Sequence, residues 1–101
     1  MTFATEMEEG MAGMMSAMHA ATATGDPDID FLAMMIPHHV GAVDMARAVL
    51  RYGRDPATRQ LAEEIIAGQT IEIEGMRRRL AMLRQPGRGK EFPALGGTRG
   101  P

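Results

Sequence analysis

The chain has 101 residues and a formal net charge of −2, and its 11 methionines stand beside no cysteine and no tryptophan. That length supports one domain, and a near-neutral charge with few aromatic residues argues against a nucleic-acid partner. No apolar run reaches the ~18 residues of a membrane span, so none is expected. Without cysteine, neither a disulfide nor a thiolate metal site can form. Methionine is the unusual feature, and it is concentrated in the first half of the chain.

Three segments have the periodicity of helices, and no segment alternates like a strand. The first spans about residues 3–22, where Thr5 and Glu8 have the spacing of a capping box. Its apolar stripe contains no Leu, Ile or Val, and its methionines are accompanied by one histidine: Met7, Met11, Met14, Met15, Met18 and His19. A core selected only for stability would use Leu, whose rotamers are better defined, so the stripe points to ligation rather than to packing alone.

Asp26 and Pro27 predict the start of a second helix, which runs to about Tyr52 and stops at Gly53. Two adjacent apolar stripes run along this helix. A helix with two such stripes contacts two partner helices, so we expect the second helix to be at the centre of the fold. The first stripe comprises Phe31, Met35, His38, Ala42, Met45, Val49 and Tyr52. The second comprises Leu32, Ile36, His39, Val43, Ala46 and Leu50.

Asp55 and Pro56 open a third helix in the same way, and it runs to about Arg84. Its stripe has one polar member, Gln69, among apolar residues: Ala62, Ile66, Ile73, Met76, Leu80 and Leu83. Because the connection to the second helix is short, these two helices must run antiparallel. The predicted fold is therefore all-α, an antiparallel bundle of three long helices over residues 1–85, followed by a flexible tail rich in Gly and Pro over residues 86–101.

The densest set of potential ligands lies in the second helix, where Met34, Met35, His38 and His39 are three or four residues apart. Such residues share a helix face, so each pair can close on one ion. Thioether and imidazole suit soft, late transition metals, and Met in particular selects Cu(I). Two alternatives stand beside this interpretation: Met fills cores, and a buried His is often structural. Pro37 between the pairs is either a tolerated kink or a local opening of the helix.

Antiparallel register places Met14 and Met15 level with Ile36 and Pro37, and Met11 level with Val40. One layer of the bundle then holds methionines and histidines from two helices, with three residues of the third helix opposite: Met11, Met14, Met15, Met34, Met35, His38, His39, Gln69, Glu72 and Ile73. Gln69 or Glu72 is placed to accept the free ring N–H of a ligating histidine. The alternatives are that Gln69 sets the register of the stripe and that Glu72 is a solvated flanking residue.

Met45 is seven residues from His38, roughly 10 Å along the helix, so these two cannot easily share an ion. Met45 belongs either to the core or to another site with Met7, and Met18, His19 and Met76 form a further candidate group. Several loosely defined soft sites suit storage or transfer of an ion, whereas catalysis needs a fixed constellation.

The stretch from Gly25 to Phe31, followed by Met-Met-Ile-Pro-His-His-Val-Gly-Ala-Val-Asp-Met-Ala at 34–46, resembles the signature of the CopM-like family, catalogued as domain of unknown function 305. The likeness continues through residues 59–76 and covers about residues 5–84. It implies a small, ferritin-like helical bundle, mostly exported, that binds copper through Met and His. On this chain the motif falls on Met34, Met35, His38, His39 and Met45. A bundle of four would take its fourth helix from the tail or from a second copy.

We therefore expect a non-enzymatic protein that sequesters or transfers copper, with Cu(I) favoured over Cu(II) and Ag(I) as a further ligand, in the periplasm or outside the cell. The sequence does not begin with the basic and apolar regions of a secretory signal. The alternative is a Met-rich helical module that binds hydrophobic peptide or associates with itself as a homodimer, without a metal role. A metal-dependent redox enzyme is a third and weaker hypothesis.

Overall fold

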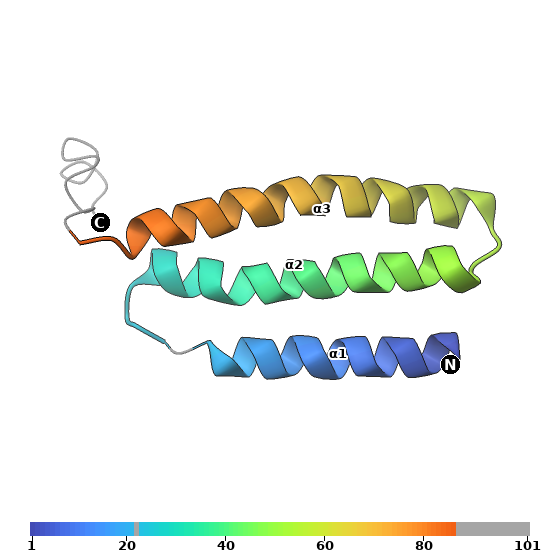
Figure 1. Cartoon of the computed structure of the whole chain (residues 1–101), viewed down its shortest axis with the longest axis horizontal. Coiled ribbons are helices and arrows are strands. Elements are labelled where there is room, and N and C mark those ends of the chain that lie inside the picture. Colours follow the sequence, from blue (N-terminus) through green and yellow to red (C-terminus); the bar gives the residue numbers. More distant parts are fainter. Residues whose placement is uncertain (22, 87–101) are drawn as a thin grey trace.

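A computed structural model describes residues 1–21 and 23–86 of the chain, which form three helices and, within those ranges, no strand. Helix α1 spans Phe3–Ala20, α2 spans Pro27–Tyr52 and α3 spans Pro56–Leu83. Successive helices run in opposite directions, and α2 lies between the other two (Figure 1). The all-α prediction is confirmed. The predicted tail, apart from Pro86, lies outside the described residues.

The helix starts follow from side chains that accept hydrogen bonds from free backbone N–H groups. Asp26 accepts from Asp28 N and Ile29 N at the start of α2, and Asp55 accepts from Thr58 N at the start of α3, as the sequence predicts. The predicted capping box in α1 is wrong, because Thr2 is the N-cap and accepts from Thr5 N. Helix α1 also ends earlier than predicted, at Ala20.

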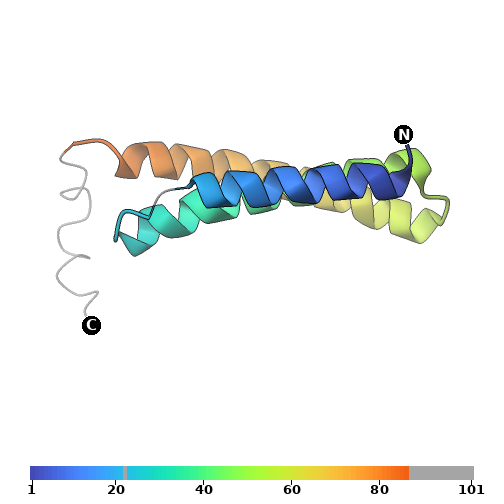
Figure 2. The ribbon, with the colours of Figure 1, turned by 90° about the horizontal axis from the view of Figure 1, so that it is seen from below.

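The tightest packing lies between α2 and α3. The buried apolar residues of this contact come from the second predicted stripe of α2 and from the stripe of α3: Val43, Ala46, Ala62, Ile73, Leu80 and Leu83. Both stripes are thus confirmed as core-forming. Among residues 1–21 and 23–86 no large side chain is completely buried, so the core of this part of the chain is thin. The two helices cross at a shallow angle, with α1 in front of them when the molecule is viewed from the side of α1 (Figure 2).

Helix α1 packs on a different side of α2 from the one that the first stripe predicted. The buried residues there are the small Gly41 and Ala48, which belong to neither stripe. A Cβ built on Gly41 would lie only 2.6 Å from Met14 Sδ, so the missing side chain is what lets α1 approach. Much of the first stripe is exposed instead: Phe31 keeps 60% of its surface and Tyr52 39%. Helix α1 itself contains no buried residue.

The residues directly before α2, at positions 24 and 25, are held against its first turn by side-chain hydrogen bonds. The Asp30 carboxylate accepts hydrogen bonds from Thr24 N and Thr24 Oγ1 through Oδ1, at 2.9 and 2.8 Å, and from Gly25 N through Oδ2 at 3.1 Å. The first turns of α2 therefore extend beyond the end of α1 (Figure 1). The predicted register is wrong by about one helical turn, because Met14 lies against Gly41 rather than level with Ile36.

Candidate metal centre

His39 lies on the side of α2 that faces α3, where both of its ring nitrogens have partners. Nδ1 is 3.1 Å from the Met35 carbonyl oxygen one turn earlier, and Nε2 is 2.7 Å from Glu72 Oε1 on α3. Both partners only accept, so both contacts are hydrogen bonds when the ring carries two protons. A metal ion on either nitrogen would replace one of these partners while the other holds the ring in place.

The sequence predicted that Gln69 or Glu72 of α3 would bond to a histidine of α2, and Glu72 is the one that does, through His39. Its side chain is 61% exposed and at the same time bonded to His39. Gln69, the other position, keeps its Oε1 buried without a hydrogen-bond partner in the described chain. The stripe position of Gln69 is thus confirmed as lying inside the α2–α3 contact, while its predicted hydrogen bond to a histidine is not formed.

His38 is different from its neighbour, because it is exposed and forms no hydrogen bond within the described part of the chain. Its ring centroid is 6.3 Å from that of His39, with the planes tilted by 57°. Met34, one turn before His38 on the same helix face, is 40% exposed. This pair offers a free imidazole and an accessible thioether from one rigid helix, which is the pairing that a soft cation uses.

The remaining candidate sulfurs divide into two groups. Met11 and Met15 of α1 are 44% and 46% exposed. The others lie half-buried along the helices: Met7, Met14, Met18, Met35, Met45 and Met76. His19 is exposed on α1, and α2 separates it and Met18 from Met76 on α3. The predicted group of these three residues and the metal roles of all the others stay predictions.

Among residues 1–21 and 23–86, no three His, Cys, Asp or Glu side chains gather closely enough to hold a metal ion. The usual ligand cluster of a structural zinc site or of a carboxylate-rich magnesium site is therefore not found among these residues.

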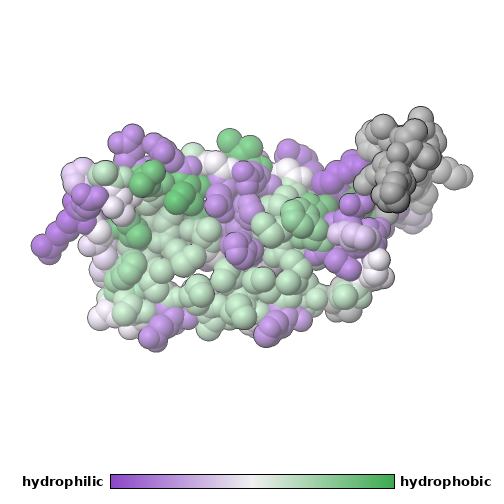
Figure 3. Space-filling view, turned by 180° about the vertical axis from the view of Figure 1, so that it is seen from behind, coloured by the Kyte–Doolittle hydropathy of each residue, from purple (hydrophilic) through white to green (hydrophobic). Residues whose placement is uncertain are grey.

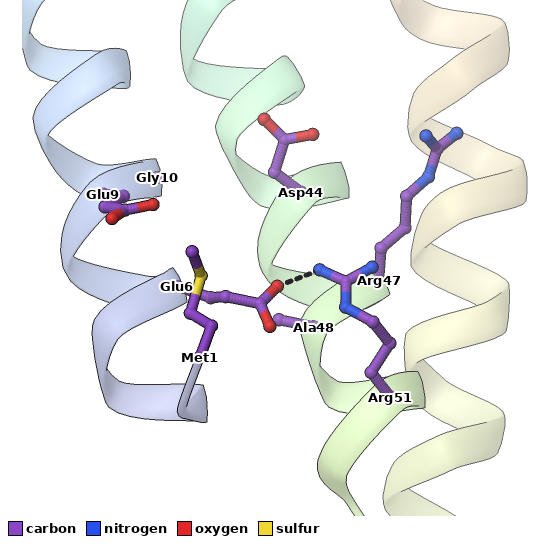
Figure 4. Close-up of a pocket in the computed structure, with 8 residues that line it drawn as sticks. All are labelled: Met1, Glu6, Glu9, Gly10, Asp44, Arg47, Ala48 and Arg51. Carbon is purple, nitrogen blue, oxygen red and sulfur yellow. Dashed lines mark hydrogen bonds and ion pairs between the residues drawn. The ribbon is translucent and has the colours of Figure 1, made fainter.

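A charged hollow lies between α1 and α2, away from the two histidines, and the sequence did not predict it (Figure 4). It has a volume of about 440 Å³, and Glu6 of α1 forms an ion pair with Arg51 of α2 at its rim. The hydrogen bond from Arg51 holds the pKa of the Glu6 carboxyl below its usual value, and Glu6 raises the pKa of Arg51 in return. A signal was present: a glutamate in the first turn of the first helix and an arginine in the last turn of the second.

Next to this pair, Tyr52 ties the end of α2 to the start of the chain. Its hydroxyl donates to the Met1 carbonyl oxygen at 2.7 Å, and its ring meets Phe3 edge-on with the centroids 6.0 Å apart. The neighbouring Glu6 carboxylate raises the pKa of Tyr52. These contacts hold the N-terminal end of α1 against the C-terminal end of α2.

Comparison with known families gives one decisive match. The model of the family described as "Domain of unknown function (DUF305)" matches residues 1–80. The chain belongs to the DUF305 family. The DUF305 match includes the whole of α1 and α2, most of α3 and every candidate ligand.

This DUF305 chain is also similar to "Uncharacterized protein L153" from Acanthamoeba polyphaga mimivirus, with 41% identity over 49 residues. The aligned part covers 48% of the DUF305 chain and 32% of the relative, so it spans about a third of that protein's length. None of the three described helices combines the length and apolar content that crossing a bilayer requires.

Proposed function

We propose that this DUF305 protein binds soft metal ions, Cu(I) above all and Ag(I) with it, and that it stores or hands on the ion without catalysing a reaction. His38 is the anchoring ligand and the thioethers around it complete the coordination. The observation that carries the proposal is the pairing of an exposed, unbonded imidazole with the accessible Met34 sulfur one turn away on α2.

The chemistry of the donor set supports a soft cargo. Thioether sulfur needs no deprotonation, so such a site keeps its affinity in acid, and it is not lost to disulfide formation as a thiolate would be. Those properties suit an oxidising compartment, and we propose a location outside the cytoplasm. His39 takes part as a second imidazole once the ion displaces either the Glu72 carboxylate or the Met35 carbonyl from its ring.

We further propose that the chain is of the copper-binding, CopM-like kind and that its three helices are part of a ferritin-like bundle. The three helices lie in one layer that leaves two faces of α2 without cover, and a four-helix bundle would have its fourth helix on one of them. Large apolar side chains exposed on that face favour a second candidate function, namely a Met-rich module that associates through this face without metal.

Titration of the pure protein with Cu(I) against a competing chelator tests the proposal. We expect binding tighter than micromolar, weakened at least about tenfold, or ~1.4 kcal/mol, in His38→Ala. The matched control is His19→Ala, which removes an exposed imidazole from α1 and is expected to change the affinity for Cu(I) less. Binding weaker than micromolar, or equal binding in a His38→Ala, His39→Ala double variant, would overturn the metal role in favour of the association module.

A further inference from the structure

Neither face of the three-helix layer is covered by any part of the described chain, and one of the two faces is mostly apolar. The contact with α1 at Gly41 and the contact with α3 at Val43 lie on opposite sides of α2, since two residues turn a helix by about 200°. The mostly apolar flank between them is what we call the open face. It is defined by exposed or half-buried residues from all three helices: Met11, Met15, Phe31, His38, Met45 and Ile65.

The open face is apolar, whereas the opposite face carries charges. Seen from the side opposite to that of Figure 1, α1 and α2 present a broad, mostly apolar area with polar residues near its middle and at its edges (Figure 3). The stripe of α2 on this side contains no carboxylate and no guanidinium from residue 31 to residue 52. Five charged side chains of α1 and α2 line the hollow on the other face: Glu6, Glu9, Asp44, Arg47 and Arg51. An apolar face of this kind marks an interaction site.

The stripe along α2 reads nearly the same from both ends. Phe31, His38, Met45 and Tyr52 follow one another at intervals of seven residues, with an aromatic ring at each end. The ring of Tyr52 also meets Phe3 of α1 and keeps 39% of the residue's surface exposed. If a second α2 lies antiparallel on the first with its centre at residues 41–42, Phe31 comes opposite Tyr52, and His38 comes opposite Met45. Ala42 at the crossing point is small, so the two helices can approach closely.

Helix α1 has the same centre of symmetry. Its exposed methionines, Met11 and Met15, lie on either side of position 13. Because Met14 contacts Gly41 and the helices run in opposite directions, position 13 is level with position 42 of α2. A two-fold axis through the middle of the α2 stripe therefore also passes the middle of the α1 methionines, which places Met11 of one copy against Met15 of the other.

The area is sufficient for a stable contact. The open face is three helices wide, with about 10 Å per helix, and α1 is about 27 Å long. The face therefore measures roughly 800 Å² per copy, which is the area that one partner contributes to a standard protein interface. A self-complementary face with a two-fold pattern fits a second copy of this chain better than a peptide, because an isologous dimer pairs each residue with its symmetry mate.

We infer that two copies of the chain pack antiparallel through the open face, and that His38 of one copy and Met45 of the partner subunit jointly hold a soft metal ion, twice per dimer. The metal part rests on the proposed function. Within one chain His38 and Met45 are about 10 Å apart along α2 and cannot share an ion, whereas across the two-fold axis they lie level. The dimer thereby gives Met45 a role that the single chain does not provide.

Light scattering and sedimentation without metal test the docking. We expect a dimer at micromolar concentration and a folded monomer for Ala42→Glu, which puts two carboxylates opposite each other at the crossing point. The control is Ala67→Glu, an exposed position of α3, which is expected to stay dimeric. A wild-type monomer at tens of micromolar, or a dimer that persists in Ala42→Glu, would overturn the inference. A monomer that binds an added hydrophobic peptide would assign the open face to a peptide instead.

Mixing His38→Ala with Met45→Ala tests the shared site by Cu(I) titration. A dimer of either variant alone has no site with both His38 and Met45. In a refolded equal mixture, half of the dimers contain one copy of each variant, and each of these has one intact site formed by His38 of one copy and Met45 of the other. We therefore expect about a quarter of the wild-type tight sites to return on mixing. No recovery, with tight wild-type binding, would refute the shared site and leave the proposed function standing. No tight wild-type binding would refute the proposed function and the shared site together, while the docking test is decided by oligomeric state alone.

Discussion

Met14 Sδ lies over Gly41, so close that a Cβ on that glycine would be 2.6 Å from the sulfur. This contact fixes how near α1 comes to α2 and which methionines face outward. It also sets the register that brings the middle of α1 level with the middle of the α2 stripe. The methionine face and its symmetry thus depend on the absence of one side chain.

Replacing Gly41 by Ala is expected to lower the free energy of unfolding by about 1–3 kcal/mol, because the new methyl group forces α1 away from α2. Gly68→Ala is the matched control, since a Cβ at Gly68 meets no atom within 4 Å. That variant is expected to gain up to about 1 kcal/mol from helix propensity. Thermal unfolding followed by circular dichroism measures both, and a stabilised Gly41→Ala would contradict the close approach.

The link between Glu6 and Arg51 predicts loss of stability in acid. The hydrogen bond from Arg51 lowers the pKa of Glu6 in the folded chain, so its contribution is complete above the unfolded value of about 4.5 and is lost as pH falls through the lower folded value. Glu6→Gln should therefore flatten the pH dependence of the unfolding midpoint below pH ~4.5. Glu8→Gln, which removes a charge of the same sign from an exposed position of α1, should leave that dependence close to wild type.

Asp30 is expected to hold the α1–α2 connection through its two carboxylate oxygens. Hydrogen bonds from Thr24 and Gly25 lower its pKa, so its contribution is lost only when pH falls below the ordinary aspartate value of about 3.8. Asp30→Asn retains one carbonyl oxygen and should loosen the segment before α2. Amide hydrogen exchange at Gly25 is expected to accelerate relative to Asp28→Asn, which alters the same turn without these contacts. Unchanged exchange would show that the connection does not depend on Asp30.

Substitution of Met34 by Leu should weaken Cu(I) binding at least about tenfold while leaving the fold intact, because Leu keeps the volume and removes the sulfur. Met82 is equally exposed, at 40%, but lies near the end of α3 away from the histidines. Met82→Leu is therefore the control, and chelator competition with both proteins should separate them. Equal affinity of the two variants would exclude Met34 as a ligand.

Sequence patterning predicts most of the fold, for physical reasons that individual residues show. Asp26-Pro27 and Asp55-Pro56 define two helix starts because the capping chemistry is local. The α2–α3 stripes are equally readable, since burial of Val43 and Ile73 follows the helical period. The side of α2 that meets α1 was not predictable in this way, because Gly41 and Ala48 are small and carry no apolar signal of their own.

The candidate site was predictable in its composition and only partly in its geometry. The spacing of Met34 and His38 on one face is a local property, and the contact between His39 and Glu72 follows from the short α2–α3 connection. The position of the α1 methionines along α2 depends on the residues before α2, where Thr24 and Gly25 donate hydrogen bonds to Asp30. The predicted register assumed a symmetrical turn and therefore misplaced these methionines by about one helical turn. The ligand roles of these residues stay predictions.

The unfolding midpoint of the full chain with and without one equivalent or more of Cu(I), measured beside Zn²⁺, tests the central claim most directly. An ion that binds only the folded state raises stability by RT ln(1 + [L]/Kd), so a free Cu(I) concentration about 100-fold above Kd should add ~2.7 kcal/mol. We expect a clear rise with Cu(I) and Ag(I), little change with Zn²⁺, and a reduced rise in His38→Ala. A midpoint that does not move with Cu(I), or that moves equally in His38→Ala, would contradict the account.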